Sequence, residues 1–179
     1  MATHAAFVRA INLGRNRRVT SAELRAPFDE LGFRNVQTFR TSGNVVFDAE
    51  PESEADMTAR IEARLTETFG YEAAIFLRTA DDVRGIAGQR PFADKLVAAS
   101  QGKIQVMLLT GKPPARARKR VLALETDRDK LRFGERELYW LPSDGTLDSA
   151  LDRQAVVDLI GPITMRTMGT IEQLAAKYF

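Results

Sequence analysis

The sequence contains no cysteine and a single histidine, His4. The lack of cysteine excludes disulfide bonds, thiolate nucleophiles, iron–sulfur clusters and the usual thiolate zinc sites. One histidine excludes multi-histidine metal sites and leaves one place for a histidine general base. We therefore expect no metal and no cofactor, and the composition identifies no catalytic residue.

Long apolar runs are also missing, since none approaches the roughly 18 to 20 residues that span a bilayer. The first residues, MATHAAFVRAINL, lack the basic region and the small-residue cleavage site of a signal peptide. With 179 residues, 44% hydrophobic and 28% charged, the composition is that of a soluble globular protein. We expect a cytoplasmic protein with no membrane partner; the sequence does not predict its oligomeric state.

The net charge of +2 hides two basic blocks. Residues 9–40 hold seven arginines against three acids, and residues 103–120 hold six basic residues and no acid. The rest of the chain therefore carries a net charge of −8. Such segregation indicates an anionic partner, although a solvated helix face would explain the second block as well.

Periodicity in the first part of the chain follows the order β-α-β-β-α-β. Thr20 and Glu23 form a capping-box pattern, Gly43 marks a turn between two short apolar segments, and Gly70 ends the second helix. The predicted elements are a strand at 5–13, a helix at 21–31, strands at 35–39 and 44–47, a helix at 53–69 and a strand at 73–77.

The same order begins again after a short helix near 80–86. The predicted elements are a strand at 104–109, a helix from 113 to 124, a hairpin of 131–133 and 138–141, a helix at 151–160, a strand at 163–165 and a terminal helix at 171–178. We therefore predict an α+β fold of two ferredoxin-like (split βαβ) units with antiparallel sheets, plus a C-terminal helix. The first unit spans 1–80, and the second spans 81–179 with a leading linker helix.

Alternation places Arg9 in the middle of the first strand, where its guanidinium must reach solvent or be paired. One interpretation is a structural salt bridge, and the other is the floor of an anion site. The following loop, which includes Asn12, Arg15 and Arg17, runs into a helix N-terminus, and such ends favour anions. The hairpin adds the polar residues Ser42 and Asn44, which turn chemistry alone would also select.

Familiar motifs do not fit this loop. It has no Lys-Ser/Thr pair of a phosphate-binding P-loop, and Gly14 stands alone where a dinucleotide fingerprint needs several glycines. The segment 40–47 lacks the aromatic pair of an RNA-recognition motif, so base stacking of that kind is not expected, whereas arginine contacts to phosphates stay open. The acidic pairs have no metal-binding spacing.

Several segments closely resemble the domain-of-unknown-function family 1697. They are Val8-Arg9-Ala10-Ile11-Asn12-Leu13-Gly14, the basic loop, Ala22-Glu23-Leu24-Arg25, Leu31-Gly32-Phe33, Val36 and Ser42-Gly43-Asn44-Val45-Val46-Phe47. The segment 164–170 is similar to the family's Thr-x-Arg-Asn-Trp-x-Thr element, with Thr167 in place of Asn and Met168 in place of Trp. Ala10 replaces the glycine usual after the arginine.

The resemblance implies a two-unit ferredoxin-like fold and a set of shared polar positions, but no reaction. Those positions are Arg9, Asn12, Ser42, Asn44, Arg166 and Thr170. We expect a protein that binds a phosphorylated or nucleotide-like small molecule at the basic strand-loop-helix surface of the first unit. The alternatives are a nucleic-acid or ribonucleoprotein accessory module that uses both basic blocks, and a protein-interaction scaffold without catalysis.

Overall fold

A computed structural model describes residues 1–9 and 19–179 of the chain. These residues form strands and helices in an order that repeats once. The elements are β1 (Ala2–Val8), α1 (Ser21–Glu30), β2 (Arg34–Phe39), β3 (Asn44–Ala49), α2 (Glu54–Phe69), β4 (Ile75–Thr79), α3 (Ala80–Ala87), α4 (Asp94–Ala99), β5 (Gln105–Leu109), α5 (Ala115–Leu122), β6 (Asp129–Phe133), β7 (Glu137–Pro142), α6 (Arg153–Ile160), β8 (Ile163–Thr167) and α7 (Met168–Tyr178).

Two four-stranded antiparallel sheets share one topology. The strand order is β2-β3-β1-β4 in the first and β6-β7-β5-β8 in the second, so the first and third strands of each repeat lie at the centre. This is the split βαβ arrangement, and it confirms the predicted α+β fold of two ferredoxin-like units. The chain divides into two compact units, one of residues 1–85 with 174–179 and the other of residues 86–173.

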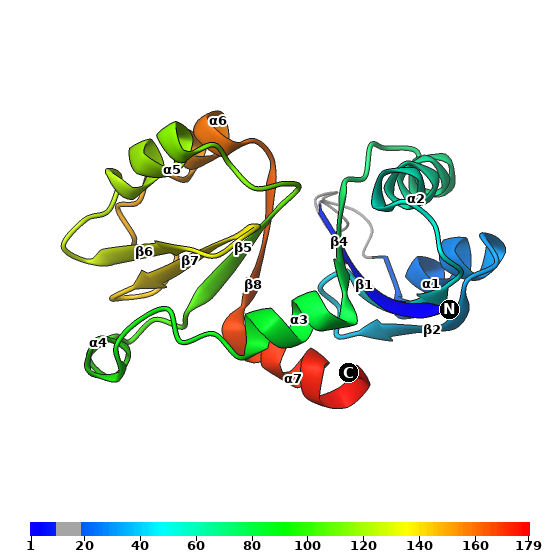
Figure 1. Ribbon diagram of the computed structural model, residues 1–179, viewed down its shortest axis with the longest axis horizontal. Coiled ribbons are helices and arrows are strands. Elements are labelled where there is room, and N and C mark those ends of the chain that lie inside the picture. Colours follow the sequence, from blue (N-terminus) through cyan, green and yellow to red (C-terminus); the bar gives the residue numbers. More distant parts are fainter. Residues whose placement is uncertain (10–18) are drawn as a thin grey trace. The chain divides into compact units, whose positions relative to one another are not determined.

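Both helices of the first repeat cover one face of its sheet (Figure 1). Leu24 and Phe28 of α1 lie four residues apart, as do Ile61 and Leu65 of α2, so each pair forms an apolar stripe on its helix. These stripes pack on buried strand residues such as Phe47. Ser53 caps α2 at its start, and Gly70 ends it in the left-handed conformation (φ +74°) that a glycine adopts without steric cost.

The second sheet is covered in the same way by α5 and α6 (Figure 1). Its core contains Val121 of α5, Val156 of α6 and the fully buried Trp140 of β7. The Trp140 indole N–H donates to the buried carboxylate of Asp129, at 2.8 Å. A large aromatic side chain is thereby buried with its one polar group satisfied.

The face of the first sheet that lies away from α1 and α2 is buried as well. Phe7 and Phe76, which lie opposite each other on β1 and β4, are 0% and 1% exposed. Phe39 of β2 lies in the same row, because it pairs with Asn44 as Phe7 does, and its ring meets that of Tyr178 edge to face at 6.0 Å. An RNA-recognition domain needs this sheet face open for bases to stack on it. Because Phe7 and Phe76 are buried, their rings are not exposed on this face.

Three local expectations need correction. β1 spans Ala2–Val8 instead of starting at residue 5, so Arg9 follows the strand and does not lie in its middle. The helix α4 was not predicted, because it has six residues, none of them buried, and no side-chain cap. The terminal helix begins at Met168, three residues before the predicted start.

Candidate functional site

The exposed Arg9 is held by backbone contacts on both sides of its strand end. The amide of Val8 donates to the carbonyl of Gly43 at 2.7 Å, and the amide of Arg9 donates to the carbonyl of Ala74 at 2.8 Å. The first contact joins the end of β1 to the turn between β2 and β3. Arg9 is therefore fixed at its Cα beside that turn, and its side chain lies in solvent.

The turn itself is organised by Asn44, whose side chain is 1% exposed. Its Nδ2 donates to the carbonyl of Phe39 and to the Oγ of Ser42, both at 2.9 Å. Gly43 adopts a left-handed φ of +73°, which a glycine tolerates without strain. Since the Ser42 oxygen accepts from Asn44, its own O–H hydrogen points away from that amide. Asn44 thus orients an exposed hydroxyl beside Arg9.

Positive side chains gather around this turn. Arg40, in the turn, lies 5.6 Å from the centre of the Phe39 ring, and the Lys177 ammonium lies 5.9 Å from the same centre. The Lys177 ammonium is also 4.9 Å from the Tyr178 ring centre. A cation over an aromatic face is attracted by the ring quadrupole, and this attraction helps to hold both charges in place. We call Arg9, Arg40, Ser42 and Lys177 the turn cluster.

The start of α1 offers fewer donors than the sequence led us to expect. The Thr20 amide donates to the Glu23 carboxylate at 2.8 Å, and the Glu23 amide donates to the Thr20 hydroxyl at 3.2 Å. This capping box, predicted from the sequence, uses two amides of the helix start and places a negative charge at its positive end. An anion would therefore not find those two amides available.

The predicted site residues fall into three groups. Arg9, Ser42 and Asn44 come together at one end of the first sheet, as described above. Asn12, Arg15 and Arg17 lie outside the described residues, so their contribution stays a prediction. Arg166 and Thr170 belong to the second unit.

Arg166 lies on β8 and is 9% exposed. Its Nη1 donates to the Thr164 hydroxyl at 3.0 Å and to the Met165 carbonyl at 2.8 Å. Burial lowers the pKa of Arg166 to about 10, because the charged form loses hydration, but the side chain stays charged at neutral pH. Thr170 has a local structural role, since its amide donates to the Thr167 hydroxyl at 3.2 Å in the first turn of α7.

One buried arginine, Arg78 on β4, was missed by the sequence reasoning. It is 1% exposed, and its Nη1 donates to the Leu77 carbonyl at 2.7 Å. The signal was present as a repeat: Ile75-Phe76-Leu77-Arg78-Thr79 matches Ile163-Thr164-Met165-Arg166-Thr167 in the pattern Ile-x-Leu/Met-Arg-Thr. Each segment is a strand followed at once by a helix.

The described residues contain no group of three or more His, Asp or Glu side chains that could hold a metal ion. The most buried carboxylate, Asp129, is instead occupied by local hydrogen bonds. It accepts from Trp140 at 2.8 Å, from Ser149 at 2.6 Å and from Thr126 at 2.9 Å. Burial opposes its ionisation, but these hydrogen bonds outweigh burial and hold the pKa of Asp129 below its usual value of 3.8.

A surface pocket of about 420 Å³ opens beside the starts of β1 and β2. It is lined by both Arg34 and Arg60 and by the acids Asp48, Glu50 and Glu52. The Arg60 guanidinium pairs with Glu52 at 2.9 Å and lies 5.1 Å from the Phe33 ring centre. Asp48 accepts from Asn35 and from Thr3, both at 2.7 Å. Several of the charged groups that line the pocket are thus engaged with one another, and basic and acidic side chains are mixed in its lining.

Within the described part of the chain, no helix combines the length and the apolarity that a membrane span requires. Fold and geometry thus define a two-unit, ferredoxin-like α+β protein with a small basic cluster at one sheet end. The chain belongs to the family described as "Protein of unknown function (DUF1697)", which matches residues 1–139. No curated protein matches the sequence. A solved structure, that of the conserved bacterial protein SP0830 from Streptococcus pneumoniae, is similar in fold, with a TM-score of 0.76, 22% identity and 99% of each chain covered.

Proposed function

We propose that the protein binds a phosphorylated or nucleotide-like small anion at the turn cluster of the first unit. The observation that carries this proposal is the 2.7 Å hydrogen bond from Val8 to Gly43, which fixes Arg9 beside the turn of Ser42. A guanidinium donates two parallel hydrogen bonds to a phosphate, and a neighbouring hydroxyl adds a third.

The segment that follows Arg9 supports the proposal by its composition. Arg15, Arg17 and Arg18 add three charges within nine residues of Arg9, and residues 9–20 contain no acid. Asn12 adds an amide group to the same segment. In this proposal Arg9 and Arg17 neutralise the anion, Ser42 orients it, and Asn44 acts as a positioning residue through Ser42. Ligand contact by Arg166 and Thr170 rests on the family resemblance alone.

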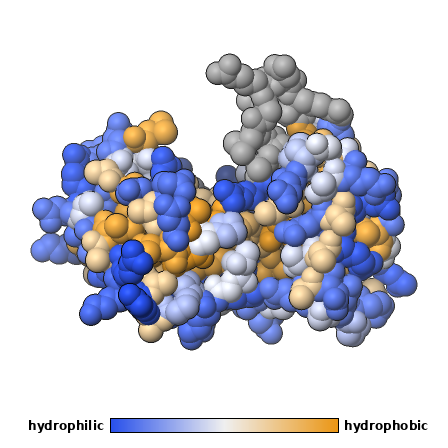
Figure 2. All heavy atoms as spheres, turned by 90° about the horizontal axis from the view of Figure 1, so that it is seen from above, coloured by the Kyte–Doolittle hydropathy of each residue, from blue (hydrophilic) through white to orange (hydrophobic). Residues whose placement is uncertain are grey.

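A scaffold function has less support. The large exposed apolar residues of the described chain are Met1, Tyr71, Leu96, Leu122 and Leu147, and each belongs to a different element or loop. On the face that Figure 2 shows, polar residues lie mainly at the periphery and apolar residues are visible between them. Protein-binding surfaces are generally formed by larger contiguous apolar patches.

The test is thermal unfolding in the presence of inorganic phosphate, nucleotides and sugar phosphates. A ligand at 100 times its Kd stabilises the fold by about 2.7 kcal/mol, which raises the unfolding midpoint by several degrees. Arg9→Ala is expected to weaken binding of the best ligand by about tenfold or more, since a hydrogen bond to a charged group contributes about 1.5–3 kcal/mol.

Arg153→Ala is the matched control, because it also removes one exposed cation but lies on α6 of the second unit. It is expected to bind like the wild type. Equal affinity of Arg9→Ala and the wild type for that ligand would refute the proposed site. A response to no phosphorylated compound would refute the proposed ligand class.

A further inference from the structure

The helix α5 in the second unit has an unusual charge composition. Four of its eight residues are cations, Arg116, Arg118, Lys119 and Arg120, and none is acidic. Like charges three or four residues apart on a helix repel by about 0.2–0.5 kcal/mol for each pair. Arg116 has such a neighbour in both Lys119 and Arg120. This repulsion destabilises α5, and the packing of α5 does not explain why so many cations lie on it.

The four cations of α5 differ in their environment. Val121 is fully buried in the core of the second unit, and Arg118 lies over the Phe133 ring, with its guanidinium carbon 4.9 Å from the ring centre. Arg116, Lys119 and Arg120 are exposed. At 100° per residue these three fall within one arc of the helix surface, roughly opposite Val121. We call them the α5 face.

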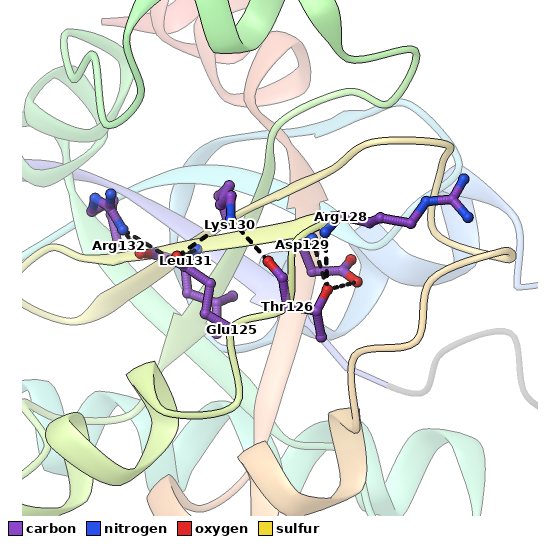
Figure 3. A network of polar contacts seen from close by, with 7 residues as sticks. All are labelled: Glu125, Thr126, Arg128, Asp129, Lys130, Leu131 and Arg132. Carbon is purple, nitrogen blue, oxygen red and sulfur yellow. Dashed lines mark hydrogen bonds and ion pairs between the residues drawn. The ribbon is translucent and has the colours of Figure 1, made fainter.

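Neighbouring cations of the same unit are paired with carboxylates. Lys112 bonds to Glu135 at 2.8 Å. After α5, Arg132 lies 3.1 Å and Lys130 3.7 Å from the carboxylate of Glu125, which also accepts from the Leu131 amide (Figure 3).

By contrast, the described residues include no carboxylate within ion-pair distance of Arg116, Lys119 or Arg120. The partnered cations stabilise the unit internally. The cations of the α5 face have no such partner among the described residues.

We propose that the α5 face binds the phosphate backbone of a nucleic acid, without reading its bases. The three exposed side chains lie along one arc of the helix, and such a row of charges suits a polymeric anion better than a small ligand. Residues three or four apart on a helix have their Cβ atoms about 5–6 Å apart. The side chains of one helix turn can therefore contact successive phosphates of one strand. The site is independent of the turn cluster, because its residues belong to the other unit.

A membrane surface fits the α5 face less well. A helix that lies on a bilayer inserts its apolar side between the lipids. The apolar side of α5 is already committed to the core through Val121, and Leu122 is its one large exposed apolar residue. Charge alone is then left for lipid binding.

The experiment measures fluorescence anisotropy of a labelled oligouridine RNA with the full chain at 50 and 200 mM salt. Three phosphate contacts predict a slope of about −2 in log K against log salt for a single strand, so the affinity falls about 20-fold over this range. The variant Arg116→Gln, Lys119→Gln, Arg120→Gln is expected to lose the affinity at 50 mM salt and most of the slope. Glutamine is a good helix former, so α5 is retained.

The matched control is Arg34→Gln, Lys95→Gln, Arg153→Gln, which removes three exposed cations elsewhere. Both variants change the net charge from +2 to −1, so a difference between them reports position and not total charge. The control is expected to keep at least half of the affinity. Equal losses in the two variants, or no binding of the wild type at 50 mM salt, would overturn the proposal. Binding of the wild type to phosphatidylserine vesicles but not to RNA would overturn it in favour of a membrane.

Discussion

Arg78 and Arg166 occupy equivalent positions in the two units. Each is the fourth residue of a five-residue strand, on β4 and β8, and each donates from Nη1 to the carbonyl of the residue before it, at 2.7 and 2.8 Å. Each is buried, at 1% and 9% exposed, and each precedes a threonine whose hydroxyl accepts an amide in the first turn of the next helix. The duplication is therefore visible in side-chain detail as well as in topology.

Replacement of either arginine is expected to destabilise the protein. Arg78→Ala or Arg166→Ala leaves a cavity and removes the donor for a carbonyl, so we expect a loss of about 2–4 kcal/mol in the free energy of unfolding. Urea denaturation followed by circular dichroism measures this loss.

Arg9→Ala is the control for these two variants. It removes the same side chain from an exposed position, so the expected change is within about 0.5 kcal/mol. If all three variants unfold at the same urea concentration as the wild type, the two buried arginines have no structural role. The contrast also makes Arg9, and not Arg166, suitable for a binding assay.

The turn beside Arg9 supplies a second prediction. Asn44→Ala removes two hydrogen bonds of a buried side chain, to the Phe39 carbonyl and the Ser42 oxygen, and is expected to cost about 1–3 kcal/mol of unfolding free energy. Ser42→Ala removes the acceptor of one of these hydrogen bonds at an exposed position where water can replace it, so it should cost less than Asn44→Ala, about 0.5–1 kcal/mol. Thermal unfolding distinguishes the two variants. A Ser42→Ala variant as unstable as Asn44→Ala would show that the hydroxyl, and not the buried amide, holds the turn.

Local sequence signals predicted those parts of the fold that short-range physics determines. The capping box of Thr20 and Glu23 and the helix end at Gly70 are confirmed, because caps and left-handed glycines depend on neighbouring residues alone. The end of β1 was misplaced since it depends on long-range pairing. Its last pair with β3 is Phe7 with Asn44, which alternation in residues 5–13 does not reveal.

The candidate site was predicted less completely than the fold. Ser42 and Asn44 were found through turn chemistry, but their hydrogen bond and the burial of Asn44 follow from packing between strands. Arg78 was missed because an arginine is ordinarily a surface residue, so hydropathy gives no sign of its burial. Only the repeated Ile-x-Leu/Met-Arg-Thr pattern distinguishes it from the exposed arginines.

Acid is expected to destabilise the protein through two carboxylates. Hydrogen bonds from Asn35 and Thr3 hold the pKa of Asp48 below 3.8, and hydrogen bonds from Ser149, Trp140 and Thr126 outweigh the burial of Asp129 and lower its pKa as well. A carboxyl group whose pKa is lower in the folded state stabilises the fold at pH values above its unfolded pKa. That contribution is lost as the pH falls from about 3.8 through the folded value.

Urea denaturation at a series of pH values from 5 to 2.5 measures this dependence. Asp129→Asn should be less stable at pH 5, because its amide N–H would face groups that donate hydrogen bonds to the carboxylate of the wild type. Its stability should also fall less steeply in acid. Asp127→Asn, which removes an exposed carboxylate nearby, should keep the acid slope of the wild type. An unchanged slope in Asp129→Asn would assign the acid sensitivity to other groups.

A close backbone approach in the second unit supplies the last prediction. A Cβ added at Gly102 would lie well inside van der Waals contact of the Pro142 carbonyl oxygen. The two segments cannot separate without loss, because the Ser100 hydroxyl donates to that same oxygen at 2.7 Å and the Gln101 amide donates to the Ser143 carbonyl at 2.8 Å. Gly102→Ala is therefore expected to lower the free energy of unfolding by about 1–3 kcal/mol or more.

Gly111→Ala is the control, because it adds the same methyl group where no atom lies within 4 Å. Its midpoint in a thermal melt should match or exceed that of the wild type. Equal midpoints for the two variants would mean that the segment around Gly102 shifts freely and that its hydrogen bonds to Pro142 and Ser143 do not hold it in place.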